Sequence, residues 1–107
     1  MKMPYELFGF ECGKGWKPLV DKLIADLRAV GWNGDIHQIK EKFGGLRFYI
    51  GEGNEKIWDL IDRASKESYT ICEECGEPGI FRRGGWIKTL CDLHHEERQK
   101  RYATIGN

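Results

Sequence analysis

Two short pairs of metal-ligand residues constrain this chain more than any other feature. Cys72 and Cys75 are separated by two residues, and after fifteen further residues Cys91 and His94 repeat the same separation. Thiols and imidazoles are the preferred ligands of structural Zn²⁺, which is held in tetrahedral coordination. A Cys-x-x-Cys loop turns both sulfurs toward one ion, and residues i and i+3 of a helix share a face. The spacing therefore predicts one structural zinc ion, held by Cys72, Cys75, Cys91 and His94.

Two other residues leave alternatives open. His95 could replace His94 as the fourth ligand, because position i+4 also shares the helical face of Cys91, although the spacing favours His94. Cys12 lies outside both pairs, and a free cysteine is most often a small buried apolar side chain. The alternative to a metal is two disulfides in a secreted protein, but no run resembling a signal peptide opens the chain. We therefore expect reduced thiols in a cytoplasmic protein.

The length and composition allow one small domain. Of the 107 residues, 40% are hydrophobic and 32% are charged, so we expect a modest core and a soluble surface. Such a core supplies little net stability, so a bound metal ion would add useful stability to the fold. No segment is apolar for long enough to cross a bilayer.

Residues 1–70 predict an α-β-β-α unit. Apolar residues recur at helical spacing from Pro18 to Val30, so we expect an amphipathic helix there. A second helix is expected to begin after the N-cap Asn54 and to extend to Ser68. Its buried stripe is expected to contain Ile57, Trp58, Ile61 and Ala64.

A β-hairpin is expected between these helices, over residues 36–50. Gly44 and Gly45 can supply the positive φ angles of a two-residue turn, and this register places Phe43 opposite Leu46. The second face of this hairpin combines charge with an aromatic ring, which suits either single-stranded nucleic acid or plain solvation. The first face then carries Ile39, Glu41, Phe43, Leu46, Phe48 and Ile50, and the second Lys40, Lys42, Arg47 and Tyr49.

Residues 71–107 predict a zinc finger. A Gly84-Gly85 pair predicts another hairpin, with strands over residues 80–83 and 86–90. The run after Cys91 is rich in helix formers, which places the second ligand pair at the first helical turn. Knuckle, hairpin and helix in this order indicate a treble clef. The predicted fold class is therefore α+β, with the finger packed on the α-β-β-α unit as one compact domain.

Charge is unevenly distributed along the chain. Residues 1–79 carry eleven Lys/Arg and fourteen Asp/Glu, a net −3, whereas residues 80–107 carry six and three, a net +3. This excess suggests an anionic partner but is small for a dedicated nucleic-acid binder. The candidate contact residues of the finger are Arg82, Arg83, Trp86, Arg98 and Arg101.

The finger segment resembles that of the TraR and DksA transcription regulators. The resemblance rests on Ile71-Cys-Glu-Glu-Cys-Gly-Glu-Pro-Gly79, Arg82 and Thr89-Leu-Cys-Asp-Leu-His94. It implies a zinc finger in a protein that acts on bacterial RNA polymerase. The whole chain, including Gln38-Ile-Lys-Glu-Lys-Phe-Gly-Gly-Leu-Arg-Phe-Tyr-Ile50, is also similar to small hypothetical proteins of phage and prophage genomes. That similarity implies a bacterial cytoplasmic setting.

We therefore expect a non-enzymatic, zinc-stabilised interaction protein of bacterial or phage origin. Its expected partner is a host protein or a nucleic-acid-handling complex, with a role in transcription regulation. The first alternative is direct but weak binding of nucleic acid. The second is a metal-dependent nuclease, which needs metal ligands beyond the four named above. No membrane contact is expected, and the sequence leaves the oligomeric state open.

Overall fold

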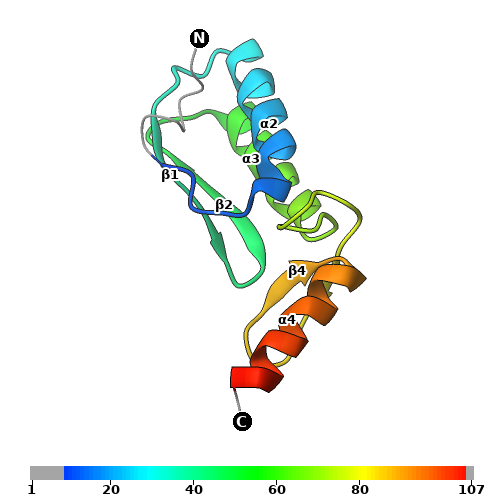
Figure 1. Ribbon diagram of the computed structural model, residues 1–107. Coiled ribbons are helices and arrows are strands. Elements are labelled where there is room, and N and C mark those ends of the chain that lie inside the picture. The colour runs from blue at the N-terminus through cyan, green and yellow to red at the C-terminus, as the bar shows by residue number, and fades with distance from the viewer. Residues whose placement is uncertain (1–8, 106–107) are drawn as a thin grey trace.

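Residues 9–105 fold into four helical segments and four β-strands, and the strands form two separate two-stranded antiparallel sheets (Figure 1). The computed structural model describes residues 9–105, with side chains up to residue 101. This mixture of helices and small antiparallel sheets confirms the predicted α+β class. In chain order the elements are the 3₁₀-helix η1 (Lys14–Trp16), α2 (Lys17–Ala29), β1 (Ile36–Lys42), β2 (Gly45–Ile50), α3 (Glu55–Ser68), β3 (Ile80–Arg82), β4 (Lys88–Leu90) and α4 (Asp92–Ile105).

The hydrophobic core lies between the β1–β2 hairpin and the two helices α2 and α3, which pack on each other beside it (Figure 1). Pro18 stands in the first turn of α2, where a missing backbone N–H costs nothing. From there the apolar residues recur at helical spacing and face inward. The fully or nearly fully buried members are Trp16, Val20, Leu23, Ile24, Leu27, Ile36, Ile39 and Leu46.

Helix α3 begins as predicted but buries a narrower face. The Asn54 side chain accepts a 3.0 Å hydrogen bond from the Ile57 amide, which confirms the N-cap. Ile57 and Ala64 are buried, whereas the predicted burial of Trp58 is wrong, because its side chain is 45% exposed. Trp58 follows Ile57 by one residue, which turns it about 100° away from the hairpin. The buried face instead ends at Ser68, whose hydroxyl accepts a hydrogen bond from the Leu46 amide.

The hairpin register differs from the predicted one by two residues. Lys42 pairs with Gly45, so the turn is made by Phe43 and Gly44, whose φ angles are 52° and 82°. From Ile39 to Phe48 a shift of two keeps the paired strand residues on their predicted faces, but it moves Phe43 from the core into an exposed turn. The reason lies outside the hairpin, because a Cβ atom at Gly45 would stand 2.3 Å from the Tyr69 ring. Gly45 is therefore needed for close packing against Tyr69, and Phe43 adopts the left-handed backbone conformation of the turn.

The loop before α2 lies directly against the first cysteine pair. The Gly15 amide donates a 2.7 Å hydrogen bond to the Glu73 carbonyl, and the Trp16 indole N–H donates one of 2.9 Å to the Ile71 carbonyl. A Cβ atom at Gly15 would stand only 2.2 Å from the Cys72 carbonyl oxygen. Glycine at this position therefore permits two backbones to touch.

A partly buried ion network joins β4 to β1 and to the first cysteine pair. The Lys88 ammonium lies 3.1 Å from a Glu73 carboxylate oxygen and 3.3 Å from one of Glu41. Burial opposes charge on Lys88, but the two carboxylates raise the pKa of this lysine above its ordinary value. Next to it, the Thr89 hydroxyl donates a 2.7 Å hydrogen bond to the Gly44 carbonyl in the β1–β2 turn.

Replacing Lys88 by Met is expected to destabilise the protein by about 3 kcal/mol, because the buried Glu73 carboxylate then lacks its counter-charge. Urea denaturation measures the change. The raised lysine pKa means that the ion pairs persist at neutral pH and weaken only as pH rises above the ordinary lysine range. The matched control is Lys66→Met, since Lys66 forms an exposed pair with Asp62 and should change stability by less than about 0.5 kcal/mol.

Replacing Phe43 by Asn is expected to stabilise the fold by about 1 kcal/mol, because Asn adopts a positive φ angle at lower cost and Asn-Gly favours this turn. Chemical denaturation again provides the measurement. Phe43→Ala removes the same ring but keeps a residue poorly suited to the turn, so it should bring no gain. A destabilised Asn variant would show that the ring itself supports the fold.

Candidate metal centre

Four side chains from two segments meet between the end of α3 and the first turn of α4. Cys72 and Cys75 lie on the turn that follows α3, and Cys91 precedes α4 by one residue. His94 is in the first turn of α4, so it lies on the same side as Cys91. Ligand atoms of these four residues all lie within 4.8 Å of one another. The structure thus brings together the four residues that the spacing predicts.

The distances between these atoms fit a tetrahedral site. The Cys75 and Cys91 sulfurs are 3.8 Å apart, and His94 Nδ1 lies 3.2 Å from the Cys91 sulfur and 3.7 Å from that of Cys72. Two sulfurs bound to one Zn²⁺ at about 2.3 Å would be separated by about 3.8 Å. The cluster could therefore hold one metal ion, and its three sulfurs and one nitrogen are consistent with zinc.

The protein environment prepares the Cys72 thiol for ionisation. Burial opposes its negative charge, but backbone hydrogen bonds from Cys91, Cys75 and Glu74 dominate and lower the pKa of Cys72 to about 7. At Cys75 a backbone hydrogen bond from Glu77 acts in the same direction, yet burial and the two neighbouring thiols raise its pKa to about 11. A first thiolate therefore forms near neutral pH, and a bound cation would favour ionisation of the others.

The structure places the two residues whose roles the sequence left open, His95 and Cys12. His95 is outside the ligand cluster and lines a hollow on the other side of α4, together with Arg83 and Arg98. Cys12 is half-buried against the hydrophobic core. Burial, followed by the charges of nearby glutamates, raises the pKa of Cys12 to about 12. This thiol is therefore protonated at neutral pH and poorly reactive.

The predicted contact residues fall into two groups. Arg82 is occupied within the fold, since its guanidinium contacts Asp92 at 2.7 Å and the Leu90 carbonyl at 3.2 Å. Arg47 is half-buried and directed at Ser65 of α3. Lys40 and Tyr49 line a shallow hollow together with Glu11, His37, Gln38 and Ile50. By contrast Arg83, Trp86 and Arg101 are exposed, and Trp86 reaches 65% exposure.

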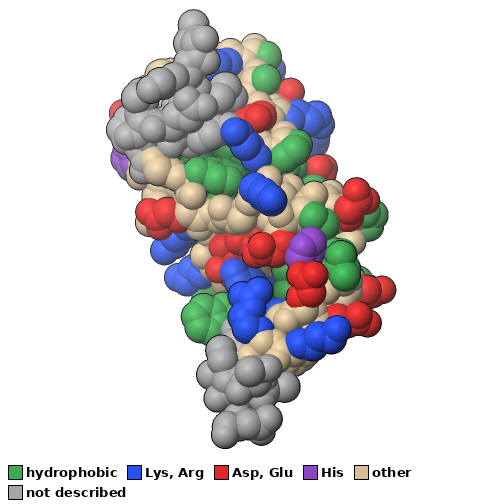
Figure 2. Space-filling view, in the orientation of Figure 1, with side chains coloured by type: hydrophobic (Ala, Val, Ile, Leu, Met, Phe, Trp, Pro, Cys, Tyr) green, Lys and Arg blue, Asp and Glu red, His purple; other side chains and the backbone are tan. Residues whose placement is uncertain are grey.

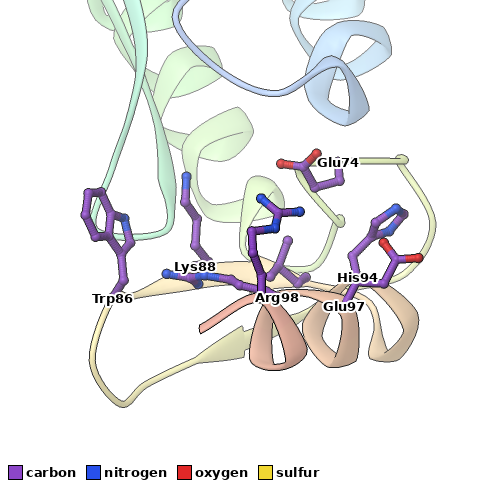
Figure 3. Close-up of a pocket in the computed structure, with 8 residues that line it drawn as sticks. Glu74, Trp86, Lys88, His94, Glu97 and Arg98 are labelled. Carbon is purple, nitrogen blue, oxygen red and sulfur yellow. The ribbon is translucent and has the colours of Figure 1, made fainter. Parts of the chain in front are cut away.

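A hollow of about 400 Å³ adjoins the ligand cluster along β4 and α4. In Figure 3 Trp86 stands at one end of it and His94 at the other, with Lys88 and Arg98 between them. Figure 2 shows basic side chains beside hydrophobic ones on the part of this face that β4 and α4 occupy. The strands of the second hairpin are shorter than predicted, Ile80–Arg82 and Lys88–Leu90, so Trp86 belongs to the connecting loop.

Several residues around the centre were missed at the sequence level. Glu73 is buried and accepts a hydrogen bond from the Gly13 amide, although its position between two cysteines suggests an exposed knuckle. Thr89 is also fully buried. The sequence signal for this contact is the pair of glycines Gly13 and Gly15, where a Cβ atom would stand 2.4 Å and 2.2 Å from the carbonyl oxygens of Glu73 and Cys72.

These observations define the class of protein as an α+β protein with a Cys₃His cluster that could hold one metal ion. Within residues 9–105, no helix is both long and apolar enough to cross a membrane. The chain matches no protein-family model, no curated protein and no solved structure. The resemblances expected from the sequence therefore stay predictions.

His94→Ala is expected to lose tightly bound zinc, whereas His95→Ala should retain one zinc per chain, because only His94 faces the three sulfurs. Elemental analysis after dialysis against a weak chelator measures this. Loss of one ligand should weaken binding by at least about tenfold. Equal zinc content in the two variants, or none in the unmodified protein, would contradict the assignment.

Proposed function

We propose that this chain is a non-enzymatic, zinc-stabilised interaction protein of bacterial or phage origin that binds a host protein in the cytoplasm. In this proposal, residues 71–107 form a treble-clef-like finger packed on the α-β-β-α unit. The observation that carries the proposal is the inward-facing Cys₃His cluster, which combines a knuckle at Cys72 with the first turn of α4.

The ligand set favours a structural role over a catalytic one. A catalytic zinc keeps one coordination position for water or substrate, whereas four protein ligands complete a tetrahedron. The centre also lies where the segments meet, because Cys72 contacts η1 and Cys91 directly follows β4. Metal binding would therefore stabilise the arrangement of these elements. This argues against the nuclease alternative.

The exposed surface favours binding as the activity. Phe43 and Trp86 are large apolar side chains that are 62% and 65% exposed, and both lie at hairpin turns. Aromatic side chains flanked by arginine are typical anchors of protein interfaces. Transcription regulation is the process that we propose for such a partner, on the sequence resemblance alone.

Direct nucleic-acid binding is the second candidate. It is favoured by a hollow lined by Arg83, Trp86 and Arg98, which could hold a phosphate beside a base. Against it, Arg82 is already paired with Asp92, and the net charge of the chain is zero. A protein partner therefore ranks first.

The immobilised full chain is expected to retain a specific protein from a bacterial lysate after nuclease treatment, and the isolated partner should bind the purified chain directly. The zinc-deficient His94→Ala variant should lose this partner, because the metal holds the finger together. Quantitative mass spectrometry and a binding titration with the purified partner provide the measurement. Retention that disappears with nuclease would support the nucleic-acid candidate instead, and failure of direct binding would reject the proposal.

A further inference from the structure

Two exposed aromatic side chains from distant parts of the sequence border the same hollow. Phe43 belongs to the β1–β2 turn and Trp86 to the β3–β4 loop, and both line one hollow of about 410 Å³ together with Glu41, Gly85 and Ile87. Large apolar side chains that gather in this way mark interaction sites more often than scattered ones do. We call Phe43, Arg83, Trp86 and Arg98 the tip surface.

Phe43 is poorly suited to its position by the requirements of folding. It has a φ angle of 52° and its side chain is 62% exposed. An aromatic residue in the left-handed region costs about 1 kcal/mol or more, whereas Asn or Gly fits such a turn. A strained residue of this kind points to a role outside the fold.

The two hairpins that carry Phe43 and Trp86 contact each other directly. Thr89 on β4 donates a 2.7 Å hydrogen bond to the Gly44 carbonyl, next to Phe43. A Cβ atom at Gly44 would stand 3.0 Å from the Phe81 ring and 3.2 Å from the Ile87 side chain. The two turns therefore meet with almost no space between them. A preformed site loses less entropy when it binds a ligand.

The charge on one side of Trp86 favours an anionic ligand. On the side away from Lys88, Trp86 borders a hollow of about 370 Å³ whose wall includes Arg83 and also Arg98, which lines the hollow of Figure 3 as well. None of the residues that line this hollow is Asp or Glu; the others are Arg82, Gly84, Gly85, His95 and Gln99. Arginine binds carboxylates in a planar, bidentate geometry.

We infer that the tip surface binds an acidic polypeptide segment whose apolar side chain enters the hollow between Phe43 and Trp86, while its carboxylates contact Arg83 and Arg98. The inference rests on the proposed function, because it names the chemistry of the protein partner. The apolar hollow provides the anchor and the adjoining basic hollow provides the specificity.

Two observations favour a polypeptide over a single-stranded nucleic acid. The Lys42 ammonium lies 5.7 Å from the centre of the Phe43 ring, so it covers a ring face on which a base would stack. On the Lys88 side of Trp86, Glu74 and Glu97 line the hollow of Figure 3 and would repel neighbouring phosphates. A polypeptide places its charges at chosen positions and avoids this repulsion.

The test uses the zinc-loaded full chain and a short synthetic peptide in which glutamates flank one phenylalanine and one leucine. Fluorescence anisotropy measures its affinity, and NMR measures which residues shift. The expected result is binding with shifts at Phe43 and at the Trp86 indole. Three comparison ligands are the peptide with Ser in place of Phe and Leu, the peptide with Lys in place of Glu, and an oligothymidylate of equal length, all of which should bind more weakly.

Two variants locate the site on the chain. Trp86→Ala and Phe43→Asn should each weaken peptide binding by about tenfold. The matched control is Trp58→Ala, because Trp58 is 45% exposed on α3 but does not line the hollows beside Trp86, and its affinity should be unchanged. Phe43→Asn is expected to fold at least as stably as the unmodified chain, so a lower affinity cannot result from unfolding. Zinc content verifies the fold of Trp86→Ala.

The outcomes separate this inference from the proposed function. If the chain captures a protein partner and the Trp86→Ala and Phe43→Asn variants capture it equally well, the docking site is wrong and the proposed function stands. If the peptide with Ser in place of Phe and Leu, or the peptide with Lys in place of Glu, binds with the same affinity as the acidic peptide, the proposed docking site is also wrong. If the oligothymidylate binds more tightly than the acidic peptide and no protein partner binds directly, both proposals are wrong.

Discussion

The buried carboxylate of Glu73 is the point on which the arrangement of the molecule depends. It directly follows Cys72, accepts a hydrogen bond from the Gly13 amide and contacts the Lys88 ammonium. One side chain therefore connects the Cys₃His cluster, the loop before α2 and strand β4. A buried ion pair adds little net stability, but an unpaired buried charge is costly, so the network mainly excludes other arrangements of these segments.

Local features of the chain were predictable because their causes lie within a few residues. The spacing within the Cys72–Cys75 and Cys91–His94 pairs is enough to predict that the two side chains of each pair face the same way. Asn54 caps α3 through a contact with Ile57, three residues away. The amphipathic pattern of α2 likewise depends on spacing alone. His94 could be preferred to His95 for the same reason, since i+3 spacing to Cys91 is a local property.

The features that were not predictable depend on contacts between distant segments. The register of the β1–β2 hairpin follows from Gly45 packing against Tyr69, which lies 24 positions later in the chain. Trp58 is exposed because α3 presents Ile57, Ala64 and Ser68 to its neighbours. This orientation is set by the packing of the helix against the other elements. Burial of Glu73 requires Lys88 and Gly13, and nothing in the Cys-Glu-Glu-Cys motif indicates either partner.

The metal centre and the tip surface lie at opposite ends of one short strand, and this links them physically. Strand β4 ends one residue before Cys91, and its Lys88 and Thr89 attach it to Glu41 and to the β1–β2 turn. A metal ion bound to Cys91 would therefore limit the positions available to Trp86, which precedes the other end by two residues. Such an ion would add a second attachment of β4 to those that Lys88 and Thr89 already make with the β1–β2 hairpin. A metal ion would thus support the proposed binding without contacting the ligand, by helping to fix the strand that precedes its site and follows Trp86.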